Sequence, residues 1–198
     1  MNWSDPISTF QFSIIDFESA GELKGQADVP IQVGITTRDS RGFAVEEDLR
    51  SYIQTTRPIT WQASKVHGIK KEDLFSAPQF SELWPQISTR LKGRIIVAHN
   101  AGTEKKFLSH FPLHRFGPWI DTLELSRKLF PDLKSYTLGD LIKIFKLEER
   151  LTLAYPTLDF HDALYDSAAT WALLENMIEL ANLWGCPLKT VLDISGKS

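Results

Sequence analysis

Hydrophobic positions follow two different periods along the chain, and together they predict a mixed α/β fold. Residues 10–17 are aromatic and β-branched and stop at a turn containing Gly21, which is typical of a buried strand. Residues 30–37 alternate apolar and polar side chains, and residues 38–42 supply the turn chemistry of a hairpin whose return strand is expected at 43–53. The chain is therefore expected to open with three antiparallel strands.

After Pro58 the spacing becomes helical. A helix is expected from Pro78 to just before Gly93, and the short apolar run 94–98 follows it as a buried central strand. Later segments continue this pattern: a helix at 103–110, a short strand at 119–121, helices at 123–130 and from 135, and a long helix at 162–183. The predicted fold is α/β, with a mixed five-stranded sheet and helices on both faces.

Composition and charge narrow the class of protein. The 198 residues are 42% hydrophobic, and no linker divides them, so one domain is expected over 1–198, with its core at about 10–184 and a short tail at 185–198. The net charge of −3 argues against a broad surface for gripping long duplex nucleic acid. The single cysteine, the absence of an 18-residue apolar run and the lack of a signal-peptide pattern predict a cytoplasmic protein that does not enter a membrane.

Two carboxylates at the end of the first strand are candidates for chemistry. Asp16 and Glu18 lie two residues apart, so in a strand they point to the same side. Such a pair is repulsive unless a cation lies between its members, although a solvated strand end would also tolerate acids. Glu104 lies in the first turn of the helix after the central strand, where it either complements the helix dipole or joins the same site.

A third cluster opens the long helix. Asp166 follows His161 by five residues, about 140° around a helix, so His161 is expected at the helix start beside a site that Asp166 reaches. A surface acid is the alternative for Asp166, but the small residues Ala163, Ala168 and Ala169 indicate close packing there. His99 is interpreted as ordering the loop before the helix that carries Glu104, and the lysines near these clusters as solvated helix faces. The six tryptophans are assigned to the core.

Taken in order, these segments resemble the three exonuclease motifs of the DEDDh family, which includes the proofreading subunit epsilon of bacterial DNA polymerase III. The motifs are 14–18, 98–101 with the acid at 104, and His161-x-Ala163-Leu164-x-Asp166. Shorter segments between them match in order and rough spacing: Arg57-Pro58-Ile59, Val66-His67-Gly68-Ile69, Asp121-Thr122 and Tyr136-Thr137-Leu138. The resemblance covers roughly residues 10–180.

This resemblance implies a ribonuclease H-like fold and a 3′–5′ exonuclease with two divalent cations. The implied metal ligands and general base are Asp16, Glu18, Glu104, Asp166 and, as the base, His161. The implied contacts with the terminal nucleotide are Gln62 and His67, together with the backbone amides near Ser19 and Ala20. Two positions depart from the family pattern, because Glu104 stands where aspartate is usual and Gln62 where an acid is common.

The donor set also indicates which cations to expect. Carboxylate oxygens suit Mg²⁺ or Mn²⁺, whereas zinc favours nitrogen and sulfur ligands. Hydrolysis of a phosphodiester needs an activated water and a stabilised leaving oxygen, which two such cations can supply together. An imidazole can accept the proton of that water near neutral pH. Because glutamate adds a methylene, Glu104 would slow turnover if its donor were displaced by about 1 Å.

The function expected is removal of nucleoside 5′-monophosphates from the 3′ end of single-stranded DNA or a frayed duplex. The same chemistry suits RNA or oligoribonucleotides, and Glu104 keeps open a catalytically weakened nucleic-acid-binding module. An unrelated α/β protein is a third class, and it predicts that Glu18 and Asp166 lie far apart. Nucleic-acid 3′ ends are the expected partner, and the sequence leaves a polymerase or a second copy of the chain open.

Overall fold

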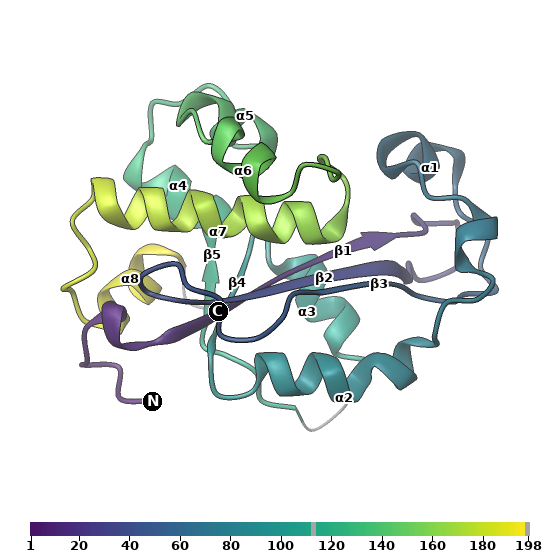
Figure 1. Cartoon of the computed structure of the whole chain (residues 1–198), viewed down its shortest axis with the longest axis horizontal. Helices are drawn as coiled ribbons and strands as arrows, with labels where there is room; N and C mark the ends of the chain where they lie inside the picture. The colour runs from purple at the N-terminus through teal and green to yellow at the C-terminus, as the bar shows by residue number, and fades with distance from the viewer. Residues whose placement is uncertain (112–113, 197–198) are drawn as a thin grey trace.

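One mixed sheet forms the centre of the molecule. The computed structural model describes residues 1–111 and 114–196, and within them it contains five strands and eight α-helices (Figure 1). The strands are β1 (Gln11–Ser19), β2 (Pro30–Asp39), β3 (Leu49–Tyr52), β4 (Ile95–Ala98) and β5 (Trp119–Asp121). They lie in the order β3-β2-β1-β4-β5, antiparallel from β3 to β1 and parallel from β1 to β5. The predicted mixed five-stranded sheet is confirmed.

Helices cover both faces of this sheet, as predicted (Figure 1). They are α1 (Trp61–His67), α2 (Phe80–Leu91), α3 (Gly102–Leu108), α4 (Thr122–Leu129), α5 (Leu138–Ile144), α6 (Glu148–Ala154), α7 (Ala163–Leu180) and α8 (Leu188–Ile194). Two short 3-10 helices join them, η1 (Ile7–Thr9) and η2 (Lys71–Leu74). Among the residues that the structure describes, no helix combines the length and the apolarity needed to cross a bilayer.

The central strand β1 divides the core into two halves. Its side chains alternate, so Phe12 and Ile14 pack with α7 on one face, while Ile15 and Phe17 pack with α2 and α3 on the other. Asp16 continues the same alternation beyond Ile14 and therefore lies on the α7 face. The alternation of apolar residues in β1 that builds the core therefore also places Asp16 on the face covered by α7.

The start of α7 rests directly on the sheet at a glycine. Gly34 of β2 pairs with Asp16 of β1 in the antiparallel register. A Cβ added at Gly34 would lie 2.1 Å from the carbonyl carbon and oxygen of Ala163 and 2.2 Å from the nitrogen of Leu164. Only a residue without a side chain allows this approach. Gly34 therefore sets the distance between the first turn of α7 and the strand that carries Asp16.

We expect the Gly34→Ala variant to be less stable and less active. The added methyl group meets backbone atoms, which cannot rotate away, so the cost is about 3 kcal/mol. The melting temperature should fall by roughly 10 °C in a domain of this size. Calorimetry checks this result, with Gly185→Ala as the control because a Cβ there meets nothing within 4 Å. Equal melting temperatures for the two variants would contradict this account of the α7 contact.

Three expectations from the sequence need correction. The return strand expected at 43–53 is only Leu49–Tyr52: Ala44 forms an isolated bridge to Arg38, and the ladder does not continue because Glu46 donates its N–H to the side-chain oxygen of Thr37. The tail expected at 185–198 contains α8, whose Leu188 and Val191 are fully buried against the α7 half of the core, and only 197–198 lie outside the described residues. The tryptophans are not all in the core, since Trp61 and Trp3 are 71% and 51% exposed.

Candidate active site

The five predicted catalytic residues come together at one edge of the sheet. Strands β1 and β4 are parallel, so their carboxyl ends reach the same edge, where ligand sites of α/β proteins form. The end of β1 carries Asp16 and Glu18, and the loop after β4 leads into α3 with Glu104 in its first turn. The first turn of α7 brings Asp166, with His161 just before the helix.

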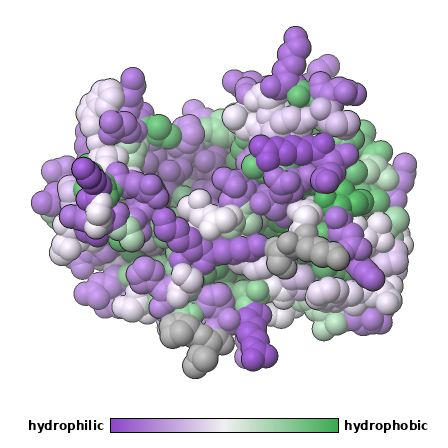
Figure 2. Space-filling model, turned by 180° about the vertical axis from the view of Figure 1, so that it is seen from behind, coloured by the Kyte–Doolittle hydropathy of each residue, from purple (hydrophilic) through white to green (hydrophobic). Residues whose placement is uncertain are grey.

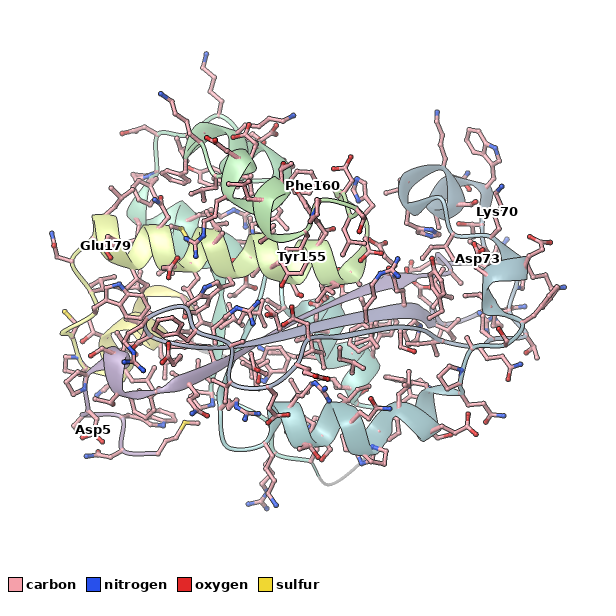
Figure 3. All side chains as sticks on the ribbon, viewed as in Figure 1. Asp5, Lys70, Asp73, Tyr155, Phe160 and Glu179 are labelled. Carbon is pink, nitrogen blue, oxygen red and sulfur yellow. The ribbon has the colours of Figure 1, made fainter. Side chains whose placement is uncertain are left out.

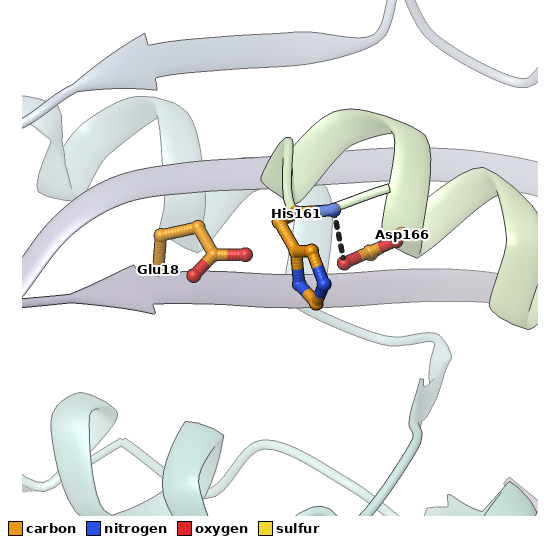
Figure 4. Close-up of side chains that lie close together, drawn as sticks. All are labelled: Glu18, His161 and Asp166. Carbon is orange, nitrogen blue, oxygen red and sulfur yellow. Dashed lines mark hydrogen bonds between the residues drawn. The ribbon is translucent and has the colours of Figure 1, made fainter. Parts of the chain in front are cut away.

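Glu18, His161 and Asp166 lie close enough together to hold one metal ion (Figure 4). One oxygen of each acid and one ring nitrogen of His161 all lie within 4.8 Å of one another. Residues separated by more than 140 positions in the chain therefore share one small volume. The interpretation of the acids as coincidental, which predicts that Glu18 and Asp166 lie far apart, is wrong.

Crowding and burial shift the acid–base properties of the four carboxylates. Burial raises the pKa of Asp16 well above its usual value of 3.8, and the charges of neighbouring acids, Asp166 first, raise it further. Burial followed by the charge of Asp166 raises the pKa of Glu18 to about 8. Burial is also the largest cause that raises the pKa of Glu104 to about 8 and of Asp166 to about 7. A site of this kind favours either protons or cations at neutral pH.

The donor atoms of the cluster fit divalent cations. Glu104 is 3% exposed and Asp166 is 8% exposed. Among residues 1–111 and 114–196, Oε2 of Glu104 and Oδ1 of Asp166 are buried side-chain oxygens without a hydrogen-bond partner. Such an oxygen is costly unless something binds it. Because all four acids offer hard oxygen donors, the residues fit a site for Mg²⁺ or Mn²⁺.

The backbone around His161 is fixed by the cluster itself. His161 has a left-handed backbone conformation, with φ of 69°, and its N–H donates to Oδ2 of Asp166 at 3.1 Å. Its side chain is exposed. The imidazole therefore projects from a fixed point of the main chain while remaining accessible to solvent.

Asp162 caps the start of α7 and is held by two side chains from the sheet. Its Oδ1 accepts a hydrogen bond from the N–H of Leu164 at 3.1 Å. Its Oδ2 accepts hydrogen bonds from Nε2 of Gln32 and from Nε of Arg50, each at 2.8 Å. Oε1 of Gln32 in turn accepts the N–H of Ala163 at 3.0 Å. Burial alone would raise the pKa of Asp162, but the hydrogen bonds from Arg50 and Gln32 outweigh it and lower the pKa.

The bonds that Gln32 and Arg50 make to Asp162, called here the Asp162 brace, could not be predicted from the sequence. Gln32 is 1% exposed in β2, but a glutamine in a strand that alternates apolar and polar residues gives no sign in the sequence of being buried. The brace joins residues of β2, β3 and the start of α7. These residues lie far apart in the sequence, so no spacing between them indicates that they are in contact. The brace fixes the residue next to His161 to two strands of the sheet.

The side chain of Asp121 fixes the loop before α3. The side chain of Asp121 accepts the N–H groups of Asn100 at 3.0 Å and Ala101 at 2.9 Å, and it also caps α4 through Leu123. The ring of His99 lies between the Thr122 hydroxyl and the Tyr136 carbonyl oxygen, each at 2.9 Å, in agreement with the predicted structural role. These bonds set where α3 begins and hence where Glu104 lies.

The residues predicted to contact a terminal nucleotide differ in their surroundings. Gln62 lies on α1 with an exposed side chain. Nδ1 of His67 accepts the N–H of Ile69 at 3.0 Å, so Nε2 carries the proton and donates to the Ser19 carbonyl oxygen at 3.2 Å. The Ala20 N–H donates to the carbonyl oxygen of Val29 at 3.0 Å. The His67 nitrogens and the Ala20 amide thus form hydrogen bonds within the protein, and their contact with a terminal nucleotide stays a prediction.

The raised pKa values predict how stability depends on pH. An acid whose pKa is higher in the folded state stabilises that state fully below its ordinary value of about 4, and this stability is lost as the pH rises through about 7 to 8. We expect these groups to lower the melting temperature of the metal-free protein between about pH 6 and pH 8.

Bound cations should reverse this trend, because they bind the deprotonated acids. At a concentration of about 100 times the dissociation constant, Mn²⁺ should add about 2.7 kcal/mol of stability. The increase in melting temperature should be larger at about pH 8 than at about pH 6. Scanning calorimetry with EDTA or Mn²⁺ measures both effects. A metal-induced increase that is equal at the two pH values would show that the four acids are not the groups responsible.

Comparison with known proteins gives one consistent family. The RNase_T family, described as exonuclease, matches residues 13–174. The chain is 31% identical over 184 residues to exodeoxyribonuclease 10 of Escherichia coli (strain K12), covering 93% of this chain and 74% of that one. It is 28% identical over 189 residues to a PolC-type DNA polymerase III of Caldanaerobacter subterraneus subsp. tengcongensis, covering 93% of this chain but only 13% of the polymerase.

Solved structures agree with these relatives. Exonuclease X in complex with 5′ overhanging duplex DNA has a TM-score of 0.72 and 27% identity, and the match covers 93% of this chain and 99% of that one. The nuclease domain of 3′hExo, a DEDDh family member bound to rAMP, has a TM-score of 0.65 at 16% identity, covering 90% of this chain and 96% of that one. The second likeness concerns the fold alone.

Proposed function

The chain belongs to the RNase_T family of exonucleases, and from that premise we propose that it is a 3′–5′ exonuclease that removes nucleoside 5′-monophosphates from DNA 3′ ends. One observation carries the proposal: Glu18, His161 and Asp166 share one small volume, Asp16 and Glu104 belong to the same group of acids with raised pKa values, and two of the acid oxygens have no partner among the described residues. We further propose that residues 1–198 act as a single exonuclease domain.

Each of the five residues has a role in this proposal. Asp16, Glu18, Glu104 and Asp166 would hold two Mg²⁺ or Mn²⁺ ions. When bound, these ions supply an activated water and stabilise the leaving 3′ oxygen. His161, whose ring nitrogen lies within 4.8 Å of an oxygen of Glu18 and of Asp166, would accept the proton of the attacking water. Asp166 also holds the main chain of His161, so the base and the acid cluster keep one fixed geometry.

The relatives favour DNA as the substrate. The relative that shares 31% identity is an exodeoxyribonuclease, and the solved exonuclease X structure contains duplex DNA with a 5′ overhang. We propose single-stranded DNA and the recessed or frayed 3′ ends of duplexes as substrates. RNA of the same sequence serves as the comparison in the test, because the same acids can act on either backbone.

The test is hydrolysis of labelled oligonucleotides with Mg²⁺ or Mn²⁺. A 5′-labelled strand should shorten one nucleotide at a time, and the released product should carry its phosphate on the 5′ oxygen. DNA should be degraded faster than RNA of the same sequence. The Asp16→Ala and His161→Ala variants should lose this activity. Binding of the oligonucleotide with no metal-dependent release of nucleotides would favour a binding module and overturn the proposal.

Glu104 permits a sharp prediction within this mechanism. If its carboxylate is a metal ligand, the Glu104→Asp variant keeps the charge and restores the shorter side chain usual in the family, so kcat should stay equal or rise. Glu104→Ala should lower kcat by about 10²-fold, since a misplaced or missing donor has an effect of that order. Steady-state kinetics with Mg²⁺ compares the two variants. An equal loss in both would mean that the site is built around the longer side chain.

A further inference from the structure

A basic stretch of the chain lies beside the acidic site. Residues 49–71 contain five of the 22 lysines and arginines but none of the 25 aspartates and glutamates. Acids lie directly outside it, with Asp48 before the stretch and Glu72 and Asp73 after it. The stretch comprises β3, the loop after it, α1 and the start of η2. An acid-free cationic segment favours an anionic partner.

Two hydrogen bonds clamp α1 to the strand that carries the acids. The N–H of Thr60, the residue that caps α1, donates to the Ala20 carbonyl oxygen at 2.7 Å. At the other end of the helix, Nε2 of His67 donates to the Ser19 carbonyl oxygen at 3.2 Å. Both acceptors lie within two residues of Glu18. The helix therefore borders the candidate active site as a fixed part of the fold.

The arrangement leaves a hollow between α1 and the opening of α7. Figure 1 shows α1 standing out from the body at the end of β1, facing the first turn of α7. Figure 2, from behind, shows the surface hollowed between the lobe with α1 and the lobe with α5 and α6. A nucleic-acid strand whose 3′ end reaches the acids would run through this hollow or along α1 or α7 at its sides. The bases and phosphates next to the scissile bond would then meet α1.

Helix α1 carries a large exposed aromatic ring. Trp61 is 71% exposed, so the core does not explain it. The ammonium group of Lys65 lies 5.1 Å from the centre of this ring. Val66 of α1 and Phe75 at the end of η2 are also exposed, at 55% and 64%. Within residues 1–111 and 114–196, none of Lys65, Lys70 and Lys71 takes part in an ion pair.

We propose that Trp61, Lys65, Lys70 and Lys71, called here the α1 platform, bind the nucleic-acid strand upstream of its 3′ end. A base stacks on the Trp61 ring, and the lysines contact the phosphates that follow. Aromatic rings combined with basic side chains are the usual means of holding single strands without sequence preference. Charge favours a phosphodiester over a protein partner, because the segment has no acid, and of its five cations only Arg50, which binds Asp162, takes part in an ion pair among the described residues. The inference rests on the proposed exonuclease function.

The kinetic test compares a long substrate with a minimal one. Wild type and Trp61→Ala are assayed on a single-stranded DNA of about 12 nucleotides and on the p-nitrophenyl ester of thymidine 5′-monophosphate, which has no upstream strand. The ratio of kcat/KM on the oligonucleotide to kcat/KM on the ester should fall about tenfold in Trp61→Ala, the usual effect of losing one stacked base. Trp61→Phe should restore most of this ratio because it keeps a ring.

A binding test addresses the lysines. Fluorescence anisotropy of the labelled oligonucleotide, with Ca²⁺ in place of Mg²⁺ to prevent turnover, measures affinity at several salt concentrations. The double variant Lys70→Gln/Lys71→Gln should lower the slope of log affinity against log salt by about 0.7 for each lost phosphate contact. Trp61→Ala should weaken binding about tenfold with little change in that slope.

Matched controls separate the platform from general surface effects. Trp3→Ala removes another exposed tryptophan, and Asp5 near it lies at the opposite end of the molecule from Lys70 (Figure 3). Lys128→Ala removes an exposed lysine of α4. Both controls should match wild type in the kinetic ratio and in affinity.

The outcomes distinguish this inference from the function on which it rests. If wild type cleaves both substrates and Trp61→Ala leaves the ratio and the affinity unchanged, the α1 platform is refuted and the exonuclease function stands. A change in self-association with unchanged nucleic-acid binding would also refute it, because the surface would then bind a protein. If wild type cleaves neither substrate, the proposed function fails, and the anisotropy measurements alone decide whether the platform binds a strand.

Discussion

Asp16→Asn is expected to lower kcat for 3′-end hydrolysis by about 10³-fold, since a bound cation contributes several kcal/mol to such a reaction. Asp16 lies at the centre of the cluster, and burial together with the charges of the neighbouring acids raises its pKa. An amide keeps the shape of the carboxyl group but loses its charge as a metal ligand. Above about pH 8, where the neighbouring acids are deprotonated, the same variant should have a higher melting temperature without metal, because like-charge repulsion in the site is relieved.

The opposite signs of these two effects make the prediction specific. A residue with a merely structural role would lose activity and stability together, whereas a buried metal ligand is destabilising until the metal binds. The increase in melting temperature on adding Mn²⁺ should also be smaller in Asp16→Asn than in wild type. Asp132→Asn, which removes one exposed carboxylate of the surface, is the control for the change in charge. Wild-type turnover by Asp16→Asn would remove Asp16 from the mechanism.

The parts of the fold that the sequence predicts are those with strong periodicity. Strand β1 and helix α7 are long, apolar and repetitive, and they define the two faces of the sheet. The acids follow from them, because Asp16 continues the alternation of β1 and Asp166 lies in the first turn of α7. The family resemblance drawn from the three motifs is confirmed, and the roles of the individual residues stay predictions.

The parts that the sequence does not predict depend on contacts between distant elements. The brace on Asp162 needs Gln32 and Arg50 from two strands, and their register is fixed only by the folded sheet. Helix α1 has no buried residue, so it shows no apolar stripe, although Thr60 at its start and Gly68 at its end are typical caps. The sequence also does not predict that His67 joins α1 to β1, because the acceptor of its hydrogen bond is the backbone carbonyl oxygen of Ser19.

These features together explain how a repulsive cluster is kept in one place. The acids raise one another's pKa values, so without cations they favour moving apart. Gly34 lets α7 rest on the sheet, and the brace on Asp162 fixes the helix start to β2 and β3. Asp121 fixes the loop before Glu104 in the same way. The rigid supports lie around the cluster, so the geometry does not depend on attraction between its members.

His161 should contribute about 10²-fold to 10³-fold to kcat, as expected of a general base. We choose His161→Asn to test this, because asparagine tolerates the left-handed backbone at this position, with φ of 69°. The variant should keep the N–H bond to Asp166, fold normally and lose most of its turnover. Its melting temperature should still rise on adding Mn²⁺, since the four acids remain.

A second variant separates the role of base from that of metal ligand. His161→Gly also suits the left-handed backbone and leaves room beside the acids, so added imidazole should restore part of kcat if the missing group is a proton acceptor. Addition of imidazole to wild type, which keeps its own ring at this position, serves as the control. If instead the increase in melting temperature with Mn²⁺ disappears and imidazole has no effect on kcat, then His161 acts as a metal ligand, because a base can be replaced from solution without changing how the acids bind cations.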